Sequence, residues 1–225
     1  MEFGPVFWVL AGLSAASAAA YGIFFLDKPP TLLRALIKTA FLGLLTAAFV
    51  VAGARTELIL ALALSAAGDF FLGFDKKWVL PLGILAFLLA QLLYTLIFFA
   101  LWLLAPDGAP LWPRYAMMAL IILTTIGFLF WMGPKLGWMA LGVVPYSIAI
   151  TAMACMAMWL PWAGWPAMLG ALSFLASDFV LSAELFRLAP DAPQRRITGP
   201  VVWWTYAAAQ LLIVTGVVLA ARVMV

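Results

Sequence analysis

Apolar runs of about 20 residues follow one another along almost the whole chain, and only short polar breaks separate them. Runs of that length are what a helix needs to cross the hydrocarbon core of a bilayer. Charged residues make up 9% of the 225 residues and apolar residues 68%, whereas a soluble domain carries about 25% charged residues. So few charges cannot cover a water-facing surface. This composition excludes a soluble globular protein, a disordered chain, a nucleic-acid-binding protein and a disulfide scaffold.

The apolar runs are continuous and do not alternate, which favours membrane helices over membrane strands. We therefore predict an all-α integral membrane protein that forms a single polytopic domain over residues 1–225. Polar breaks rich in Pro, Gly and charged residues, such as Pro106-Asp107-Gly108 and Gly133-Pro134-Lys135, separate the helices. Eight transmembrane helices are predicted at about residues 5–26, 31–51, 57–74, 79–104, 111–131, 137–160, 165–186 and 200–222.

The basic residues divide unevenly between the two sides of this topology. One set of loops holds eight of them: Lys28, Arg34, Lys76, Lys77, Lys135, Arg187, Arg195 and Arg196. The other set, together with both termini, holds Arg55, Arg114 and Arg222. Because the loops richer in Lys and Arg lie in the cytoplasm, both termini are predicted outside, and a bacterial inner membrane is the expected location.

Two short motifs recur four helices apart. Gly68-Asp69-Phe70-Phe71-Leu72 resembles Ser177-Asp178-Phe179-Val180-Leu181, and Ala90-Gln91-Leu92-Leu93 resembles Ala209-Gln210-Leu211-Leu212. Helices four apart have the same orientation in the membrane. The recurrence therefore suggests two parallel four-helix halves.

The sequence contains no histidine and a single cysteine, Cys155. A Ser-His-Asp triad, an imidazole base and a His-ligated metal site are therefore excluded. One cysteine cannot form an intrachain disulfide, and Cys155 stands in an apolar run where a buried thiol is expected.

Three ionisable residues fall well inside predicted helices: Lys38, Asp69 and Asp178. An ionisable group at the centre of a membrane helix costs at least about 2.5 kcal/mol, so its presence favours a functional role. Glu184 and Arg187 stand at the end of their helix, three residues apart, and are predicted to form an interfacial ion pair.

The three ionisable residues fall in the predicted cytoplasmic half of the membrane, and further polar side chains lie there or near the middle: Tyr146, Tyr206, Gln91, Tyr94 and Gln210. One polar cavity between helices, opening to the cytoplasm, would account for the whole set. Tyr and Gln also hold membrane helices together by hydrogen bonds, which is the alternative for these residues. Lys38 could instead extend toward the interface beside Arg34, one turn nearer the cytoplasm.

Two buried carboxyls can divide acid and base roles. Burial favours the neutral form of a carboxyl, and a second carboxyl in the same site favours it further for one of the two. One Asp could then act as general acid and the other as base. The same two carboxyls would also suit a proton-coupled carrier of a small solute or lipid.

Around the polar residues named above, the chain resembles the YhhN family, which includes the lysoplasmalogenases. The resemblance rests on four stretches: Gly68 to Leu72, Gly83 to Tyr94, Gly170 to Asp178 and Thr205 to Leu212. Their order and spacing fit an eight-helix member over nearly the whole chain. Two positions depart from the family pattern. Lys38 is followed by Thr39 where the family tends to have Pro, and many members carry His where Gln91 stands.

The resemblance implies a membrane hydrolase that cleaves the vinyl ether bond of lysoplasmalogen into a fatty aldehyde and a glycerophospho-alcohol. The acidic residues of the family carry over to Asp69 and Asp178. A vinyl ether hydrolyses when its β-carbon is protonated and water adds to the resulting oxocarbenium ion. We predict Asp178 as the acid because it lies deeper, and Asp69 as the base or stabiliser.

The remaining polar residues are expected to bind this substrate. Tyr146 and Tyr206 could contact the carboxyls or the glycerol, and Lys38 with Arg34 could meet the phosphate. Gln91, Tyr94 and Gln210 complete the predicted polar lining. The partner is a lysophospholipid with a single long chain, which would run among apolar side chains. No metal or organic cofactor is needed, and nothing indicates a nucleic-acid partner.

Three other functions compete with this interpretation. A carrier would use the Asp pair for proton coupling. A retinal photoreceptor would need a Schiff-base lysine on its last helix, and none stands there. A purely structural membrane protein would use the same side chains only to hold its helices together.

Overall fold

The backbone is helical because hydrocarbon offers no partner for N–H and C=O groups, so each segment must satisfy its own. A computed structural model describes residues 1–74, 76, 78–104, 111–189 and 191–223. Over these residues it contains eight α-helices and no strand. Their bounds are α1 Pro5–Ala20, α2 Leu32–Val51, α3 Thr56–Leu72, α4 Leu80–Leu104, α5 Leu111–Leu136, α6 Ala140–Ala157, α7 Trp165–Phe186 and α8 Arg195–Arg222.

Short helical segments of other pitch extend three of these helices. A π-helical stretch, Tyr21–Phe25, continues α1. The 3₁₀ turns Gly137–Met139 and Trp162–Gly164 precede α6 and α7. The all-α prediction is confirmed. Lys77 and the predicted break at Pro106-Asp107-Gly108 lie outside the described residues.

Two helices differ from their predicted bounds at a proline. α5 continues through Pro134 to Leu136, and the chain turns at Gly137, whose φ of 53° is in the left-handed region that favours glycine. α8 begins at Arg195 and includes Pro200. The prediction of a break at Gly133-Pro134 and of a start at residue 200 was wrong, because each proline removes one intrahelical hydrogen bond and neither ends its helix.

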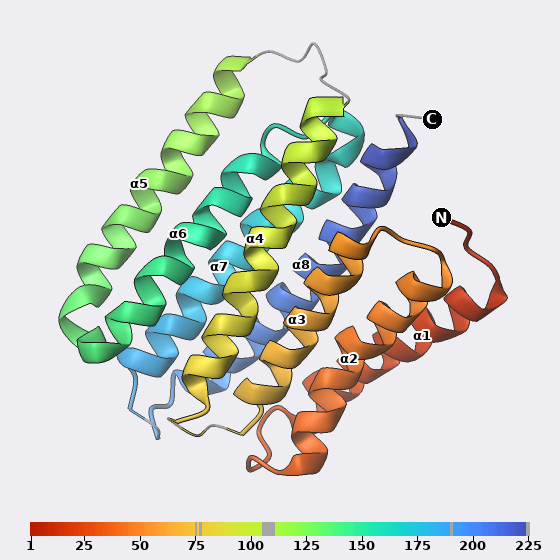
Figure 1. Ribbon diagram of the computed structural model, residues 1–225. Helices are drawn as coiled ribbons and strands as arrows, with labels where there is room; N and C mark the ends of the chain where they lie inside the picture. The colour runs from red at the N-terminus through yellow and green to blue at the C-terminus, as the bar shows by residue number, and fades with distance from the viewer. Residues whose placement is uncertain (75, 77, 105–110, 190, 224–225) are drawn as a thin grey trace. The chain divides into compact units, whose positions relative to one another are not determined.

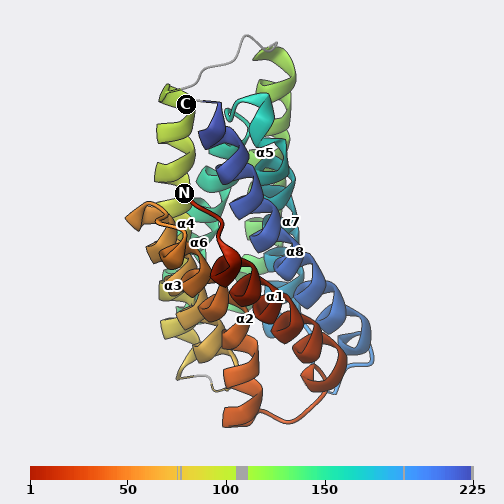
Figure 2. The ribbon, with the colours of Figure 1, turned by 90° about the vertical axis from the view of Figure 1, so that its right-hand side faces the viewer.

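The chain forms two compact units, Met1–Tyr94 and Thr95–Val225, and the boundary falls within α4. In the first unit α2 packs against both α1 and α3 (Figures 1 and 2). Ser14 and Ser17 of α1 donate hydrogen bonds to the carbonyls of Phe41 and Ile37 in α2, at 2.6 and 2.8 Å. These bonds fix the depth at which α1 lies against α2.

In the second unit α5 and α6 form an antiparallel pair, α6 packs on α7, and α7 packs most extensively on α8 (Figure 1). The hydroxyls of Thr125 in α5 and Thr151 in α6 are 2.9 Å apart. From α7, Ser173 and Ser177 donate to the carbonyls of Thr205 and Val202 in α8, at 2.9 and 3.0 Å. Hydroxyl groups thus connect neighbouring helices in both units.

Two glycines let α7 and α8 approach closely. A Cβ on Gly170 would lie 2.8 Å from the Ala209 carbonyl oxygen, and one on Gly216 would lie 2.2 Å from the backbone nitrogen of Ala167. Apolar burial does not draw helices together within hydrocarbon, so van der Waals packing of small residues supplies the attraction.

The outer surface is apolar. Large hydrophobic side chains are exposed on every helix, among them Trp8, Leu36, Leu60, Leu96, Leu123, Phe130, Ile148, Leu169 and Val201. Six described segments are long and apolar enough to cross a membrane: Pro5–Phe25, Leu32–Val51, Leu80–Leu104, Leu111–Ala157, Trp162–Phe186 and Arg195–Arg222. This is a multi-pass membrane fold. Eight separate crossings remain a prediction.

The close approach of α7 and α8 is testable by adding one methyl group. Gly216→Ala should destabilise the protein by about 1–3 kcal/mol, because the new Cβ meets backbone that cannot move aside cheaply. Gly127→Ala in α5 is the control, since nothing lies within 4 Å of its Cβ position. Thermal unfolding in detergent measures both variants, and equal melting temperatures would contradict this packing.

Candidate functional site

Lys38 and Asp69 form an ion pair in the first unit. The Lys38 Nζ is 3.3 Å from an Asp69 carboxylate oxygen, and the two side chains are 16% and 1% exposed. Lys38 lies in α2 and Asp69 in the last turn of α3. The prediction that both would lie inside helices is confirmed, and the alternative in which Lys38 extends away beside Arg34 is not what the geometry shows.

Two glycines on either side of Asp69 bring neighbouring helices close to it. A Cβ on Gly73 would lie 2.8 Å from the Cβ of Ala35 in α2, and one on Gly68 would lie 2.5 Å from the Phe87 ring in α4. α2 can therefore approach α3 closely enough for Lys38 to reach the carboxylate. The Gly68-Asp69 part of the recurring motif therefore has a packing role.

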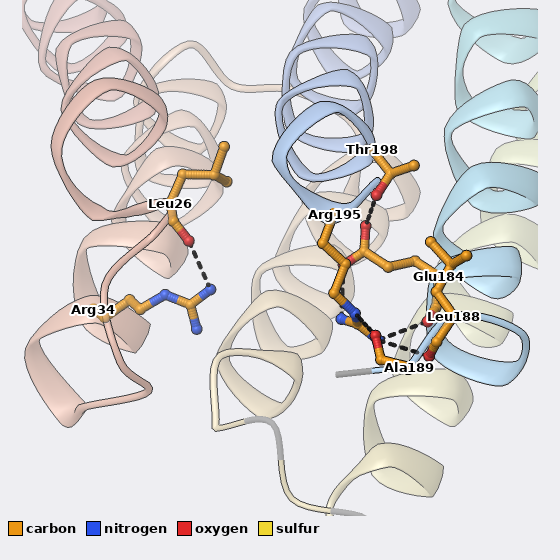
Figure 3. Close-up of polar contacts among 7 residues, drawn as sticks. All are labelled: Leu26, Arg34, Glu184, Leu188, Ala189, Arg195 and Thr198. Atoms are coloured by element: carbon orange, nitrogen blue, oxygen red, sulfur yellow. Dashed lines mark hydrogen bonds and ion pairs between the residues drawn. The ribbon is translucent and has the colours of Figure 1, made fainter. Parts of the chain in front are cut away.

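Arg34 holds the ends of two other segments. Its guanidinium donates to the carbonyls of Phe25, Leu26 and Gly73, at 3.1, 3.4 and 3.3 Å, and its bond to Leu26 is drawn in Figure 3. The guanidinium also lies 5.6 Å from the centre of the Tyr21 ring. These carbonyls end the first helix and α3, where positive charge is favourable. Arg34 thus has a structural role, and its predicted phosphate contact stays a prediction.

Gln91 and Tyr94 are fully buried in α4. The Tyr94 hydroxyl is hydrogen-bonded to Ser65, one turn before Asp69 in α3. The Ser65 hydroxyl in turn donates to the Ala61 carbonyl at 2.9 Å. Ser65 was missed by sequence reasoning, although its spacing of four residues from Asp69 places both on one helix face.

Asp178 is the buried carboxyl of the second unit. It is 8% exposed and accepts a hydrogen bond from the hydroxyl of Tyr146, which is half-buried in α6. α7 carries Asp178 about three and a half turns after its first residue, and the serine bonds described above hold this helix against α8. Tyr146 was predicted to contact a carboxyl, and this structure brings the two together.

Tyr206 and Gln210 are buried in α8, one turn apart. The Tyr206 ring packs edge-on against Phe174 of α7, with centroids 5.3 Å apart. It also contacts the Trp203 ring at 6.0 Å, with the two planes tilted by 48°. The predicted common cavity would be lined by residues of both units and stays a prediction.

The two units repeat one arrangement with different chemistry. In each, an Asp followed by Phe stands on one helix and contacts a side chain of the preceding helix: Lys38 for Asp69, Tyr146 for Asp178. The intervals in sequence are 31 and 32 residues. A lysine ammonium supplies positive charge, whereas a phenol supplies only a dipole. The two carboxyls therefore have electrostatically different partners.

Glu184 does not pair with Arg187, and the predicted interfacial ion pair was wrong. The Glu184 carboxylate accepts hydrogen bonds from Arg195 at 3.1 Å and from Thr198 at 2.5 Å (Figure 3). Arg195 also donates hydrogen bonds to the carbonyls of Ala189 and Leu188. Arg187 lies over the Trp131 ring, 4.1 Å from its centre, and donates to the Trp131 carbonyl. Arg195 reaches back to Glu184 because it is the first residue of α8, which begins earlier than predicted.

Among the described residues, no group of three or more His, Cys, Asp and Glu side chains could hold a metal ion.

Comparison with known proteins matches the part of the chain that carries these residues. Residues 33–217 match the YhhN family, a range that includes every side chain discussed above from Arg34 to Gln210. The chain belongs to the YhhN family. The resemblance stated from sequence is therefore confirmed.

Two relatives in this comparison carry the name lysoplasmalogenase. One is from Mycobacterium bovis (strain ATCC BAA-935 / AF2122/97) and the other from Mycobacterium tuberculosis (strain CDC 1551 / Oshkosh). Each is 35% identical to this YhhN-family chain over 228 residues, covering 93% of this chain and 82% of the relative. No solved structure matches the chain.

The buried ion pair is expected to matter for folding. Lys38→Met should destabilise the protein by about 3 kcal/mol, because it leaves the Asp69 carboxylate buried without its cation. Asp69→Asn should cost less, since the partly exposed Lys38 can extend toward water. The double variant should recover part of the loss, and thermal unfolding in detergent measures all three.

An exposed ion pair provides the control for these variants. Arg55 and Glu57 are 3.0 Å apart with side chains 73% and 42% exposed, so Arg55→Met should leave the melting temperature nearly unchanged. If Lys38→Met has as little effect as Arg55→Met, the Lys38–Asp69 pair does not stabilise the fold.

Proposed function

We propose that this YhhN-family protein is a lysoplasmalogenase, a membrane enzyme that hydrolyses the vinyl ether bond of a single-chain lysophospholipid. Family membership and the names of the two mycobacterial relatives support the reaction. The observation that carries the proposal is that the two buried carboxyls have different partners, Lys38 for Asp69 and Tyr146 for Asp178. This difference supports separate roles for the two Asp residues as stabiliser and acid.

The reaction needs a proton donor and a way to stabilise positive charge. A proton added to the β-carbon of the vinyl ether leaves an oxocarbenium ion. Water then adds to the carbon that bears the ether oxygen and releases a proton. The resulting hemiacetal transfers its hydroxyl proton to the ether oxygen as the C–O bond breaks. One vinyl ether and one water thus give one aldehyde and one alcohol.

Asp178 suits the role of the acid. Its partner Tyr146 carries no formal charge, so a buried Asp178 can hold a proton without losing an ion pair. After donating that proton, Asp178 is a carboxylate that accepts a hydrogen bond from the Tyr146 hydroxyl. It can then take up the proton released by water.

Asp69 suits the role of stabiliser. The ammonium of Lys38 at 3.3 Å favours the carboxylate form, and a carboxylate in a site of low polarity stabilises a developing cation strongly. A lysine ammonium carries three donors. Lys38 can therefore contact Asp69 and a substrate phosphate together, with Arg34 predicted nearer the cytoplasm.

The other polar residues complete the proposal. Tyr206 and Gln210 of α8, with Gln91 and Tyr94 of α4, are proposed to contact the glycerol or to position the two Asp side chains. The charge bias of the loops supports eight membrane crossings, both termini outside and reaction near the cytoplasmic face of a bacterial inner membrane.

Carboxamide variants test the two carboxyls. Asp178→Asn and Asp69→Asn should each lower kcat by about 10²-fold or more, because removing an acid or an electrostatic stabiliser costs that much. Aldehyde release from lysoplasmenylethanolamine by the purified protein is the measurement. Asp27→Asn, at an exposed loop position, is the matched control and should keep wild-type turnover. Wild-type turnover by Asp178→Asn would overturn its role as acid.

Deuterium identifies the carbon that is protonated. In D₂O, the aldehyde trapped by immediate reduction should carry one deuterium at the carbon next to the former carbonyl, because that carbon is the protonated β-carbon. The saturated alkyl ether analogue and 1-acyl lysophosphatidylethanolamine should not react. An aldehyde without deuterium would exclude this mechanism.

Removing the Tyr146 hydroxyl tests the partner of the acid. Tyr146→Phe should lower kcat by about tenfold and shift its pH profile while leaving KM nearly unchanged, since the lost bond is to Asp178. Tyr115→Phe, at an exposed position of α5, is the control. A change in KM alone would instead place Tyr146 in substrate binding.

A further inference from the structure

An apolar groove lies between α5 and α7 in the second unit. It has a volume of about 190 Å³ and is lined by Met117, Leu120, Ile121, Thr124, Leu172, Leu175, Ala176 and Phe179. Thr124 is the polar side chain of this lining, and its hydroxyl donates to the Leu120 carbonyl of its own helix at 2.7 Å. The side chains of the groove therefore present hydrocarbon to whatever occupies it.

The groove follows one face of each helix. On α7 its residues stand at positions 172, 175, 176 and 179, the spacing of a single helical stripe. This stripe is about 10 Å long at 1.5 Å per residue. Phe128 of α5 stacks on Phe179, with ring centroids 4.2 Å apart and planes 10° apart. The stacked rings therefore mark the Phe179 end of the groove.

The Phe179 end lies beside Asp178. Phe179 follows Asp178 directly, and Leu175 precedes it by three residues, so the same helical turn carries the carboxyl and the end of the groove. The side of the groove is open, because Leu120 is 57% exposed. A ligand could therefore enter sideways from the bilayer.

We infer that this groove binds the hydrocarbon chain of the single-chain lipid, with the reacting end toward Phe179 and Asp178. This inference rests on the proposed function. The occupant is a single chain because the groove, at about 190 Å³, is smaller than the roughly 300–1,000 Å³ of pockets that enclose drug-sized ligands. The apolar lining and the adjoining carboxyl match a molecule that is hydrocarbon at one end and reactive at the other.

Crosslinking maps the position and direction of the chain in the wild-type protein. Two lysophosphatidylethanolamine probes are used, one with a diazirine at the chain terminus and one with a diazirine near the glycerol. The terminal probe should label the Met117 and Leu172 end, and the other should label the Phe128 and Phe179 end. Excess unlabelled lysophosphatidylethanolamine should suppress both signals.

A diacyl phosphatidylethanolamine with the same diazirine chain is the control for bulk lipid. It should label lipid-facing residues such as Leu123 without competition from the lysolipid. The inference is overturned if the lysolipid probes label the groove no more than the diacyl probe does, or if both lysolipid probes label the same end.

A matched pair of variants tests the groove through chain-length preference. Leu120→Trp fills its open side and should raise KM for long-chain substrates about tenfold, the effect of displacing roughly two methylenes. The shortest-chain substrate should be affected less. Leu123→Trp makes the same change three residues away on α5, at a side chain that is 66% exposed and outside the lining, and should keep the wild-type preference. Equal chain-length profiles in the two variants would overturn the inference.

The two hypotheses can fail separately. If the wild-type protein does not hydrolyse lysoplasmalogen, the proposed function is wrong, while the crosslinking map still decides the chain site. If hydrolysis is observed and the probes label elsewhere, the enzyme assignment stands and the groove is not its chain site.

Discussion

Hydrocarbon cannot solvate charge or satisfy a hydrogen bond, and the arrangement of polar groups in this protein follows from that constraint. Asp69 and Asp178 are among the most expensive side chains to place in membrane helices. Each contacts a polar side chain of the preceding helix, Lys38 in one unit and Tyr146 in the other. The partners differ in charge, and that difference gives two carboxyls of one motif separate proposed roles.

Close helix packing supports both pairs. Around Asp69, Gly73 admits Ala35 of α2, and around Asp178, serine hydroxyls and small residues hold α7 against α8. Helices held this firmly restrict the rotation of the side chains they carry. Under the proposed function, this packing would position the two carboxyls before substrate binds, which is what general acid catalysis and electrostatic stabilisation require.

Hydropathy predicted most of the fold, and the same reading selected the polar residues on which the proposed site rests. The apolar runs gave the helices, and the rarity of charge drew attention to Lys38, Asp69 and Asp178. Ion-pair partners were harder to predict. Glu184 and Arg187 were expected to pair because they are three residues apart, yet Arg195 reaches Glu184 from the next helix. Arg34 was expected at the substrate phosphate, and the structure shows it bonded to backbone carbonyls.

The sequence by itself determined the class of fold and limited the chemistry that can be proposed for this protein. Its composition requires a membrane environment. Because it has no histidine, the proposed reaction must use carboxyl, amine and phenol groups for proton transfer and charge stabilisation. Only the tertiary structure decided which group each carboxyl meets, and that an apolar groove ends beside Asp178. The physical reason is that hydropathy acts on each segment alone, whereas hydrogen bonds and ion pairs depend on distances between helices that no single segment specifies.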